Sequence, residues 1–196
     1  YISRNDEILD FGCGSGLFSI KLSKLTKKNI TAVDISPQFI LAARKNFKKF
    51  GRNKAKFNIV PLSGLSKNTK KYDKILLVDV IHHLENIEKT IKNLKKFLKK
   101  NGNLIVFEPN LLNPLILITH FMDKNENGLL RLGLRSRYEK IFQNCNMKIK
   151  HFEYNGIIIG PESKLLNILG MILNLPFLNY FLSWLNPKVL FIVEAN

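Results

Sequence analysis

The segment ILDFGCGSG at residues 8–16 constrains the fold more than any other part of the chain. It begins with Ile8 and Leu9, branched apolar residues of the kind that end a buried strand. Three glycines follow at alternate positions: Gly12, Gly14 and Gly16. A residue without Cβ tolerates positive φ and lets a ligand approach the backbone closely. Apolar residues from Leu17 onward indicate a helix, so the segment predicts a strand, a ligand-binding loop and a helix of a βαβ unit.

The spacing of the loop is G-x-G-x-G, which differs from the dinucleotide fingerprint G-x-G-x-x-G. An acid, Asp10, stands two residues before the first glycine. A carboxylate there repels a pyrophosphate but suits a ligand that carries an ammonium group. Ser15 is a candidate N-cap for a helix over residues 15–26. The loop therefore predicts a nucleoside-like ligand with a positively charged part.

Strands and helices alternate after this loop. The strand Ile30–Val33 ends at Asp34, the register in which an acid accepts hydrogen bonds from ribose hydroxyls. Ser36 and Pro37 are expected to begin a helix that reaches about Phe50. Further strands are expected at residues 57–60, 74–78 and 104–107, with a lysine-rich amphipathic helix at 85–100. This alternation predicts a parallel, doubly wound α/β sheet.

The fourth predicted strand leads into DVIHHLEN, and the fifth ends at Glu108. Open α/β sheets bind ligands at the carboxyl ends of their strands, so His82, His83 and Glu108 are expected to face that crevice. Capping or packing is the alternative role for either histidine. No second cluster of His or Cys has ligand spacing, so no metal site is expected.

Two of these motifs resemble those of class I S-adenosylmethionine-dependent methyltransferases. Motif I of that family reads D/E-x-G-x-G-x-G, and its small-molecule members, such as those similar to quinone-biosynthesis enzymes, often read V-I/L-H-H-L after strand four. The resemblance covers about residues 6–110. It implies a Rossmann-like methyltransferase fold, with a mostly parallel seven-stranded sheet in the order 3-2-1-4-5-7-6 and strand seven antiparallel.

The resemblance also implies S-adenosylmethionine as the cofactor and roles for individual residues. Asp34 would hold the ribose, Ile35 would pack on adenine, and Asp79 would lie near the methionine amino group. This chain lacks the family's acid after strand three, so the adenine contact would fall to Leu62 or Ser63. The full set of implied cofactor-binding residues is Asp10, Gly12, Cys13, Gly14, Gly16, Asp34, Ile35, Leu62, Ser63, Asp79 and Val80. His82, His83 and Glu108 are the candidate bases.

We expect a single domain over residues 1–196, with a cofactor-binding half at about 6–110 and an acceptor and lid half at 111–196. A helical insertion at 157–187 should precede the last strand. Leu165–Pro187 carries no charge, but Pro176 interrupts it and the chain must return to the sheet, which argues against a membrane span. Two short helices are predicted instead, each with a narrow polar stripe. They form either a lid packed on the protein's own core or an apolar cover that meets a membrane surface or a lipid-like substrate.

Composition bounds the remaining possibilities. The net charge is +16, and 25 of the 31 basic residues are lysines, which include Lys45, Lys48, Lys49, Lys92, Lys95, Lys96, Lys99 and Lys100 on predicted helix surfaces. Lysines there indicate solvated faces, with an anionic membrane surface or nucleic acid as the alternative partners. Cys13 and Cys145 are the only cysteines, which favours a reducing cytoplasm, with a peripheral position at the inner membrane face left open. The chain begins at Tyr1, so a preceding segment is expected.

Three functions follow from these patterns. The favoured one is methyl transfer to a small-molecule or lipid-like acceptor. The second is a tRNA or rRNA methyltransferase that uses the lysine-rich surface. The third is a cofactor-binding scaffold without activity, because motif I specifies binding and not chemistry. The acceptor and the oligomeric state are not specified by the sequence.

Overall fold

The structure is a computed structural model that describes residues 1–50, 57–61, 65, 70–122, 127–132, 134–156 and 164–196. The chain divides into two compact units. The first contains Tyr1–Val78, Ile91–Ile105 and Ala195, and the second contains Asp79–Thr90, Val106–Glu194 and Asn196. The strands form a seven-stranded sheet in the order β3-β2-β1-β4-β5-β7-β6. The predicted α/β methyltransferase topology is confirmed.

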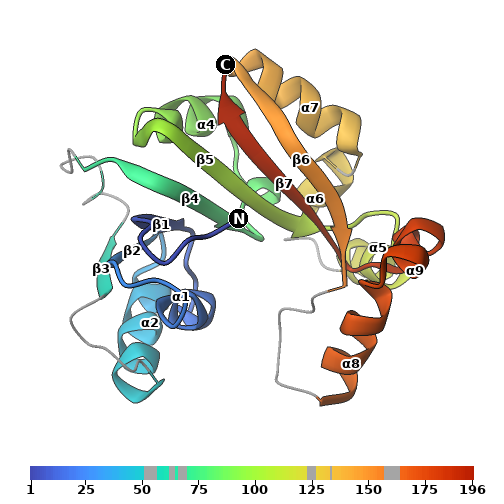
Figure 1. The fold of residues 1–196 in the computed structure, drawn as a ribbon, viewed down its shortest axis with the longest axis horizontal. Coiled ribbons are helices and arrows are strands. Elements are labelled where there is room, and N and C mark those ends of the chain that lie inside the picture. Colours follow the sequence, from blue (N-terminus) through green and yellow to red (C-terminus); the bar gives the residue numbers. More distant parts are fainter. Residues whose placement is uncertain (51–56, 62–64, 66–69, 123–126, 133, 157–163) are drawn as a thin grey trace. The chain divides into compact units, whose positions relative to one another are not determined.

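Four parallel strands form the frame of the first unit (Figure 1): β1 (Ile8–Phe11), β2 (Ile30–Asp34), β3 (Phe57–Pro61) and β4 (Tyr72–Val78). In their register, Ile8 lies opposite Ile30 on one side and Lys74 on the other. Ile8, Leu9 and Ile30 are 0% exposed. Continuous apolar runs of this kind are typical of parallel strands that are covered on both faces.

Two helices pack with these strands, α1 (Leu17–Ser23) and α2 (Pro37–Phe50). Helix α1 is shorter at both ends than the helix predicted over residues 15–26, and Ser15 is not its N-cap. Gly16 is the N-cap, with φ 76°, and its carbonyl accepts the first helical bond from Ile20. Because this left-handed conformation cannot continue a right-handed helix backward, α1 starts at Leu17.

The lysine-rich helix is also shorter than the prediction. Here α4 covers Ile87–Lys95, and β5 runs from Leu98 to Pro109. The N–H of Tyr72 donates to the carbonyl of Phe97 at 2.8 Å, just before β5 begins. A Cβ on Gly102 would lie 2.9 Å from the Tyr72 carbonyl oxygen, so this glycine allows a close approach to β4 rather than ending a helix. Residues 98–100, which were predicted to end the helix, therefore belong to the sheet.

The second unit contains the elements that follow β4, apart from parts of α4 and β5. These are η2 (Ile81–His83), α5 (Pro114–Met122), α6 (Asn127–Leu132), α7 (Arg135–Asn144), β6 (Met147–Asn155) and β7 (Lys188–Ala195). Figure 1 shows α7 beside β6, and β7 running in the opposite direction to β6. Tyr138 and Phe142 of α7 pack on Phe191 of β7, with the Tyr138 and Phe191 ring centroids 4.8 Å apart.

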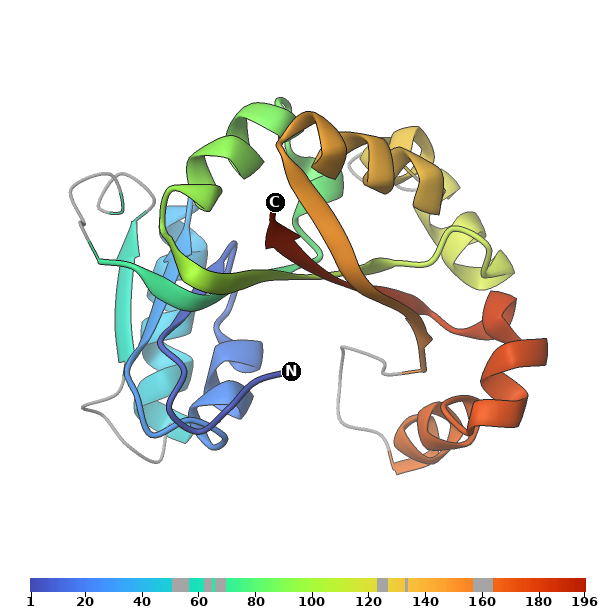
Figure 2. The same ribbon diagram turned by 45° about the horizontal axis from the view of Figure 1, so that its top comes forward.

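The described part of the insertion forms two short helices, as predicted: α8 (Lys164–Leu173) and α9 (Pro176–Phe181), followed by η4 (Ser183–Leu185). Residues 157–163 of the predicted insertion lie outside the described residues. Figures 1 and 2 both show α9 side by side with α5. Across the part of the chain that the structure describes, no helix combines the length and the apolarity needed to cross a bilayer.

Buried asparagines hold this insertion in place. The side-chain amide of Asn110, just after β5, donates to the carbonyls of Ser183 and Asn186 at 3.1 and 2.8 Å. Asn113 donates to the Leu185 carbonyl at 2.6 Å. From the insertion side, Asn174 accepts from the N–H of Gly156 at 2.7 Å, and Asn179 donates to the Tyr154 carbonyl at 2.8 Å. Asn174 and Asn179 belong to the predicted polar stripes, which therefore face the end of β6.

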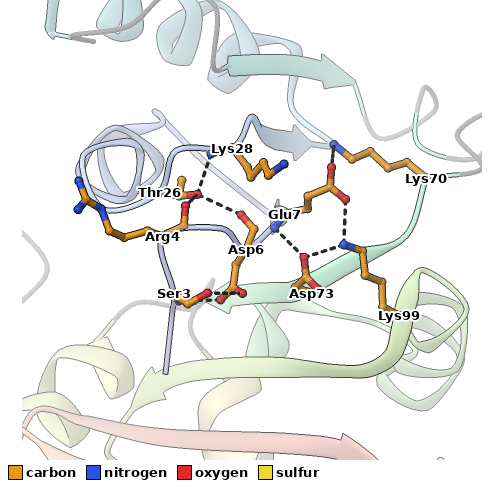
Figure 3. Close-up of polar contacts among 9 residues, drawn as sticks. All are labelled: Ser3, Arg4, Asp6, Glu7, Thr26, Lys28, Lys70, Asp73 and Lys99. Atoms are coloured by element: carbon orange, nitrogen blue, oxygen red, sulfur yellow. Dashed lines mark hydrogen bonds and ion pairs between the residues drawn. The ribbon is translucent and has the colours of Figure 1, made fainter.

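A charged cluster lies at the start of β1 and β4 (Figure 3). The Lys99 ammonium pairs with Glu7 at 3.0 Å and with Asp73 at 2.8 Å, while Lys70 pairs with Glu7 at 3.2 Å. The hydrogen bond from Lys99 is the main reason that the pKa of Glu7 is lowered. All four side chains are 28–40% exposed, so each pair contributes about 0.2–1 kcal/mol. The cluster joins strand starts and is structural.

Candidate functional site

The glycine loop between β1 and α1 has the backbone that the motif predicts. Gly12, Gly14 and Gly16 have φ values of 78°, 51° and 76°. The N–H groups of Gly12 and Cys13 both donate to the Val33 carbonyl at 2.9 Å, which ties the loop to the end of β2. The loop therefore depends on glycine for its conformation.

Two of the glycines differ in what surrounds them. A Cβ on Gly16 would lie 3.0 Å from the Cβ of Ala43, so this position lets α1 and α2 approach each other. A Cβ on Gly14 would meet nothing within 4 Å. Open space beside a backbone with left-handed glycines is what a ligand in close contact with the loop requires.

Asp34, at the end of β2, is bound to the glycine loop. Its Oδ2 accepts a hydrogen bond from the N–H of Gly14 at 2.8 Å, and its Oδ1 accepts one from the N–H of Ser36 at 2.8 Å. The neighbouring Ile35 is 81% exposed, which is unusual for an isoleucine directly after a buried strand. The sequence therefore placed Asp34 at the correct strand end, but its bond to Gly14 is visible only in the structure.

Asp10 of β1 and Cys13 of the loop are both buried. Asp10 is 1% exposed and accepts a hydrogen bond from the Ser19 hydroxyl. Burial raises the pKa of Asp10 to about 6, with the Ser19 bond opposing and nearby Asp34 adding to the effect. Burial, followed by the carboxylates of Asp10 and Asp34, raises the pKa of the Cys13 thiol to about 12. Cys13 is therefore an inert thiol at neutral pH. Leu62 and Ser63 lie outside the described residues.

In the second unit, Asp79 follows β4 with φ 55°, a rare conformation for a residue other than glycine. Its N–H donates to the Phe107 carbonyl at 2.9 Å, and its carboxylate forms an ion pair with Lys188. Val80, the next residue, is 8% exposed. Lys188 was not among the predicted site residues, although it is the first charged residue after the uncharged stretch Leu165–Pro187 and could have been noticed for that reason.

His82 and Glu108 form a buried pair. Nδ1 of His82 lies 2.5 Å from Oε2 of Glu108, and the two side chains are 1% and 0% exposed. Oε1 of Glu108 accepts the backbone N–H groups of Val80 and Ile81 at 2.9 and 2.8 Å. The sequence predicted that Glu108 faces an open crevice, and this is wrong. Its side chain is buried, and its oxygens bind the backbone and the histidine of the η2 turn. His83 is exposed, and its ring centroid is 4.0 Å from that of His82.

A close helix contact supports this histidine turn. A Cβ on Gly128 of α6 would lie 1.6 Å from the His82 carbonyl oxygen, so only glycine lets α6 approach η2 this closely. Helix α6 was not predicted, because its first residues fall in a polar stretch. Within the described ranges, no group of three or more His, Cys, Asp or Glu side chains is arranged to hold a metal ion.

Comparisons with known proteins identify the family and support the fold. The chain is 35% identical over 104 residues to a ubiquinone biosynthesis O-methyltransferase of Pelagibacter ubique, with 53% of this chain and 42% of that protein covered. It is 35% identical over 164 residues to the protein of the same name in Rickettsia akari, with coverage of 79% and 63%. The chain thus spans less than two thirds of the length of these relatives.

A solved structure supports the fold. The SAM-dependent methyltransferase from Thiobacillus denitrificans, in complex with S-adenosyl-L-homocysteine, matches with a TM-score of 0.63 and 15% identity over 100% of this chain and 87% of that one. A family model described as "Methyltransferase domain" matches residues 2–156. This match covers the glycine loop, Asp34 and the histidine turn, and it shows that the chain belongs to the methyltransferase domain family.

Proposed function

We propose that this chain transfers a methyl group from S-adenosylmethionine to a small-molecule acceptor. The observation that carries the proposal is the glycine loop, in which three left-handed glycines and the Asp34 carboxylate occupy adjoining strand ends. The residues fit the cofactor. Gly14 leaves open space beside the backbone, Asp34 offers carboxylate oxygens to ribose hydroxyls, and exposed Ile35 offers an apolar surface to adenine.

The bound cofactor would supply a methyl group that is already electrophilic, so the protein mainly has to align the acceptor and exclude water. Gly12, Gly14 and Gly16 would bind the cofactor, and the buried side chains of Asp10 and Cys13 would support the loop. His82, held by Glu108, would position the turn, and exposed His83 would accept a proton from an acceptor hydroxyl or amine.

The replacement Asp34→Ala tests cofactor binding. It should weaken S-adenosylhomocysteine binding by about 1–3 kcal/mol, roughly 5- to 150-fold, because two ribose hydroxyls lose a carboxylate partner. The Gly14 N–H also loses its acceptor, which adds to the loss. Isothermal titration calorimetry would measure the change. The control Asp6→Ala removes an acid from the N-terminal segment and should leave the affinity for S-adenosylhomocysteine unchanged. If the unchanged protein, Asp34→Ala and Asp6→Ala all bind it equally well, Asp34 is not part of the site.

Turnover is a separate measurement. Purified protein would be incubated with labelled S-adenosylmethionine and a fractionated cell extract. Label in a small-molecule or lipid fraction supports the proposal. Label in RNA, together with a steep salt dependence of RNA binding, would favour the RNA methyltransferase. Cofactor binding without transfer to any fraction would favour the scaffold.

We further propose that the insertion meets an anionic membrane surface or a lipid-like acceptor. Apolar side chains are exposed on adjoining helices, including Phe121 of α5 at 75% and Phe177 and Tyr180 of α9 at 72% and 80%. Exposed apolar residues gathered on one surface indicate an interaction site. Tyr180 and Trp184 suit a membrane interface, and a net charge of +16 attracts anionic lipid. Cytoplasmic placement against the inner membrane face belongs to this proposal.

Vesicle sedimentation tests the membrane contact. The double replacement Phe181→Asp, Trp184→Asp places two charges on the exposed insertion, so we expect most of the binding to vesicles containing phosphatidylglycerol to be lost. The control Leu41→Asp, Phe50→Asp puts the same charges on exposed apolar positions of α2 and should bind as the unchanged protein does. An unchanged protein that stays wholly in the supernatant at low salt would contradict the membrane contact.

A further inference from the structure

The second unit contains a cavity that none of the roles above uses. It has a volume of about 260 Å³ and lies between the first turn of α7 and the strands β6 and β7. Its lining includes exposed Arg135 and Ser136 as well as buried Tyr138 and Phe191, so it reaches from the surface into the core. A cavity of about 150 Å³ holds one benzene ring. This one has room for a substituted single ring.

The walls of the cavity are aromatic. Phe152 and Tyr154 come from β6, with ring centroids 5.1 Å apart, and the Phe152 ring is 4.9 Å from that of Phe191 on β7. Tyr138 completes the set at 4.8 Å from Phe191. Rings at these distances favour a flat apolar ligand that can stack or pack edge-on.

The rim of the cavity is suited to an anion. Leu134 is the N-cap of α7 and provides no side-chain cap, and the first turn contains no acid. The Arg135 guanidinium lies over the Phe152 ring, 4.6 Å from its centroid, and its Nε donates to Glu139 at 2.7 Å. Stacking and this bond fix the plane of the guanidinium, which can receive a carboxylate on its other N–H groups. The helix N-terminus adds a favourable field.

Tyr138, which lines the cavity, carries an unsatisfied polar group. Tyr138 is 1% exposed, and its hydroxyl has no hydrogen-bond partner in the described structure. An unpaired buried hydroxyl destabilises the fold, and a hydrogen bond to a ligand would offset that cost. The carboxylates of Glu108 and Asp79 act on Tyr138. They are paired with His82 and Lys188, so they repel an anionic ligand less than unpaired carboxylates would.

We propose that this cavity binds an aromatic monocarboxylate with a single ring. The carboxylate lies at Arg135 and the first turn of α7, the ring packs among Phe152, Tyr154 and Phe191, and a polar ring substituent meets the Tyr138 hydroxyl. That this ligand is the methyl acceptor rests on the proposed function. That the cavity binds it is independent of the proposed function.

Titration calorimetry with benzoate and its neutral isostere benzamide tests the carboxylate. The unchanged protein should bind benzoate at least tenfold more tightly. Arg135→Met should remove this preference. The control Arg137→Met removes the same charge from an exposed residue that does not line the cavity, and it should keep the preference. Equal binding of the two ligands by the unchanged protein, or equal effects of the two arginine variants, would overturn the proposal.

A second variant tests the interior contact. Tyr138→Phe keeps the ring but removes the hydroxyl, so it should weaken 4-hydroxybenzoate severalfold more than benzoate. Equal weakening would remove Tyr138 from the ligand contact. Each preparation is also titrated with S-adenosylhomocysteine. If the unchanged protein binds S-adenosylhomocysteine but not benzoate, only this inference is contradicted. If the unchanged protein does not bind S-adenosylhomocysteine, the proposed function is contradicted.

Discussion

Replacing Glu108 by alanine should lower the free energy of unfolding by about 3–5 kcal/mol, a large part of the 5–15 kcal/mol typical of a domain. The Glu108 side chain is 0% exposed and accepts the backbone N–H groups of Val80 and Ile81, at the start of η2, in addition to its contact with His82. Alanine leaves all three groups buried without this acceptor, which is costlier than removing both partners of a pair. Urea unfolding followed by circular dichroism would measure the loss.

Two further variants separate the causes of this loss. Glu108→Gln keeps a carbonyl oxygen for the backbone N–H groups and removes only the charge, so it should be less destabilising than Glu108→Ala. Glu139→Ala removes a half-exposed acid whose i,i+4 pair with Arg135 is worth about 0.3–0.5 kcal/mol, so its effect should be small. If Glu108→Ala unfolds at the same urea concentration as the unchanged protein, Glu108 is not the support of the turn.

The second large effect is expected for His83→Ala, which should lower turnover by about 10²–10⁴-fold while leaving S-adenosylhomocysteine affinity unchanged. His83 is exposed on η2, beside a buried histidine that Glu108 holds in place. A base on a rigid turn can meet an acceptor without rearrangement. The rate of transfer from labelled S-adenosylmethionine under single-turnover conditions would measure the chemical step.

The neighbouring histidine provides the comparison. His82→Ala removes the partner of a buried carboxylate, so it should destabilise the fold as well as slow the reaction. His83→Ala should slow the reaction at unchanged stability, because its side chain is exposed. Normal turnover in His83→Ala would show that this residue is not the base. Normal turnover and stability in both variants would leave neither histidine with a role.

Local chemistry explains why much of the first unit could be predicted. Gly12, Gly14 and Gly16 need positive φ at close spacing, which few other residues tolerate, so the loop is encoded in its own residues. The strands before and after it are apolar runs bounded by acids, and the order of elements then leaves few topologies. Asp34 could be assigned for the same reason, since a strand end after this loop lies beside it.

Other features depended on residues distant in the sequence. The pattern at residues 85–100 suits a helix, yet Leu98 and the lysines that follow it belong to strand β5. Gly102 allows this strand to lie close to Tyr72 of β4. Glu108 has the sequence context of a crevice residue, but the turn that folds back over it supplies three hydrogen-bonding partners. Neither outcome follows from residue spacing.

The glycine loop, the parallel sheet and the two short helices of the insertion could all be predicted from residue order, because each depends on backbone freedom or on local apolar periodicity. The pairing of polar groups could not, because it depends on how the chain packs. The tertiary structure placed Lys188 on Asp79, Asn110 under η4, and Tyr138 in an aromatic cavity with its hydroxyl unpaired. These contacts join segments far apart in the chain, and burial, which sets their energy, is a property of the packed fold.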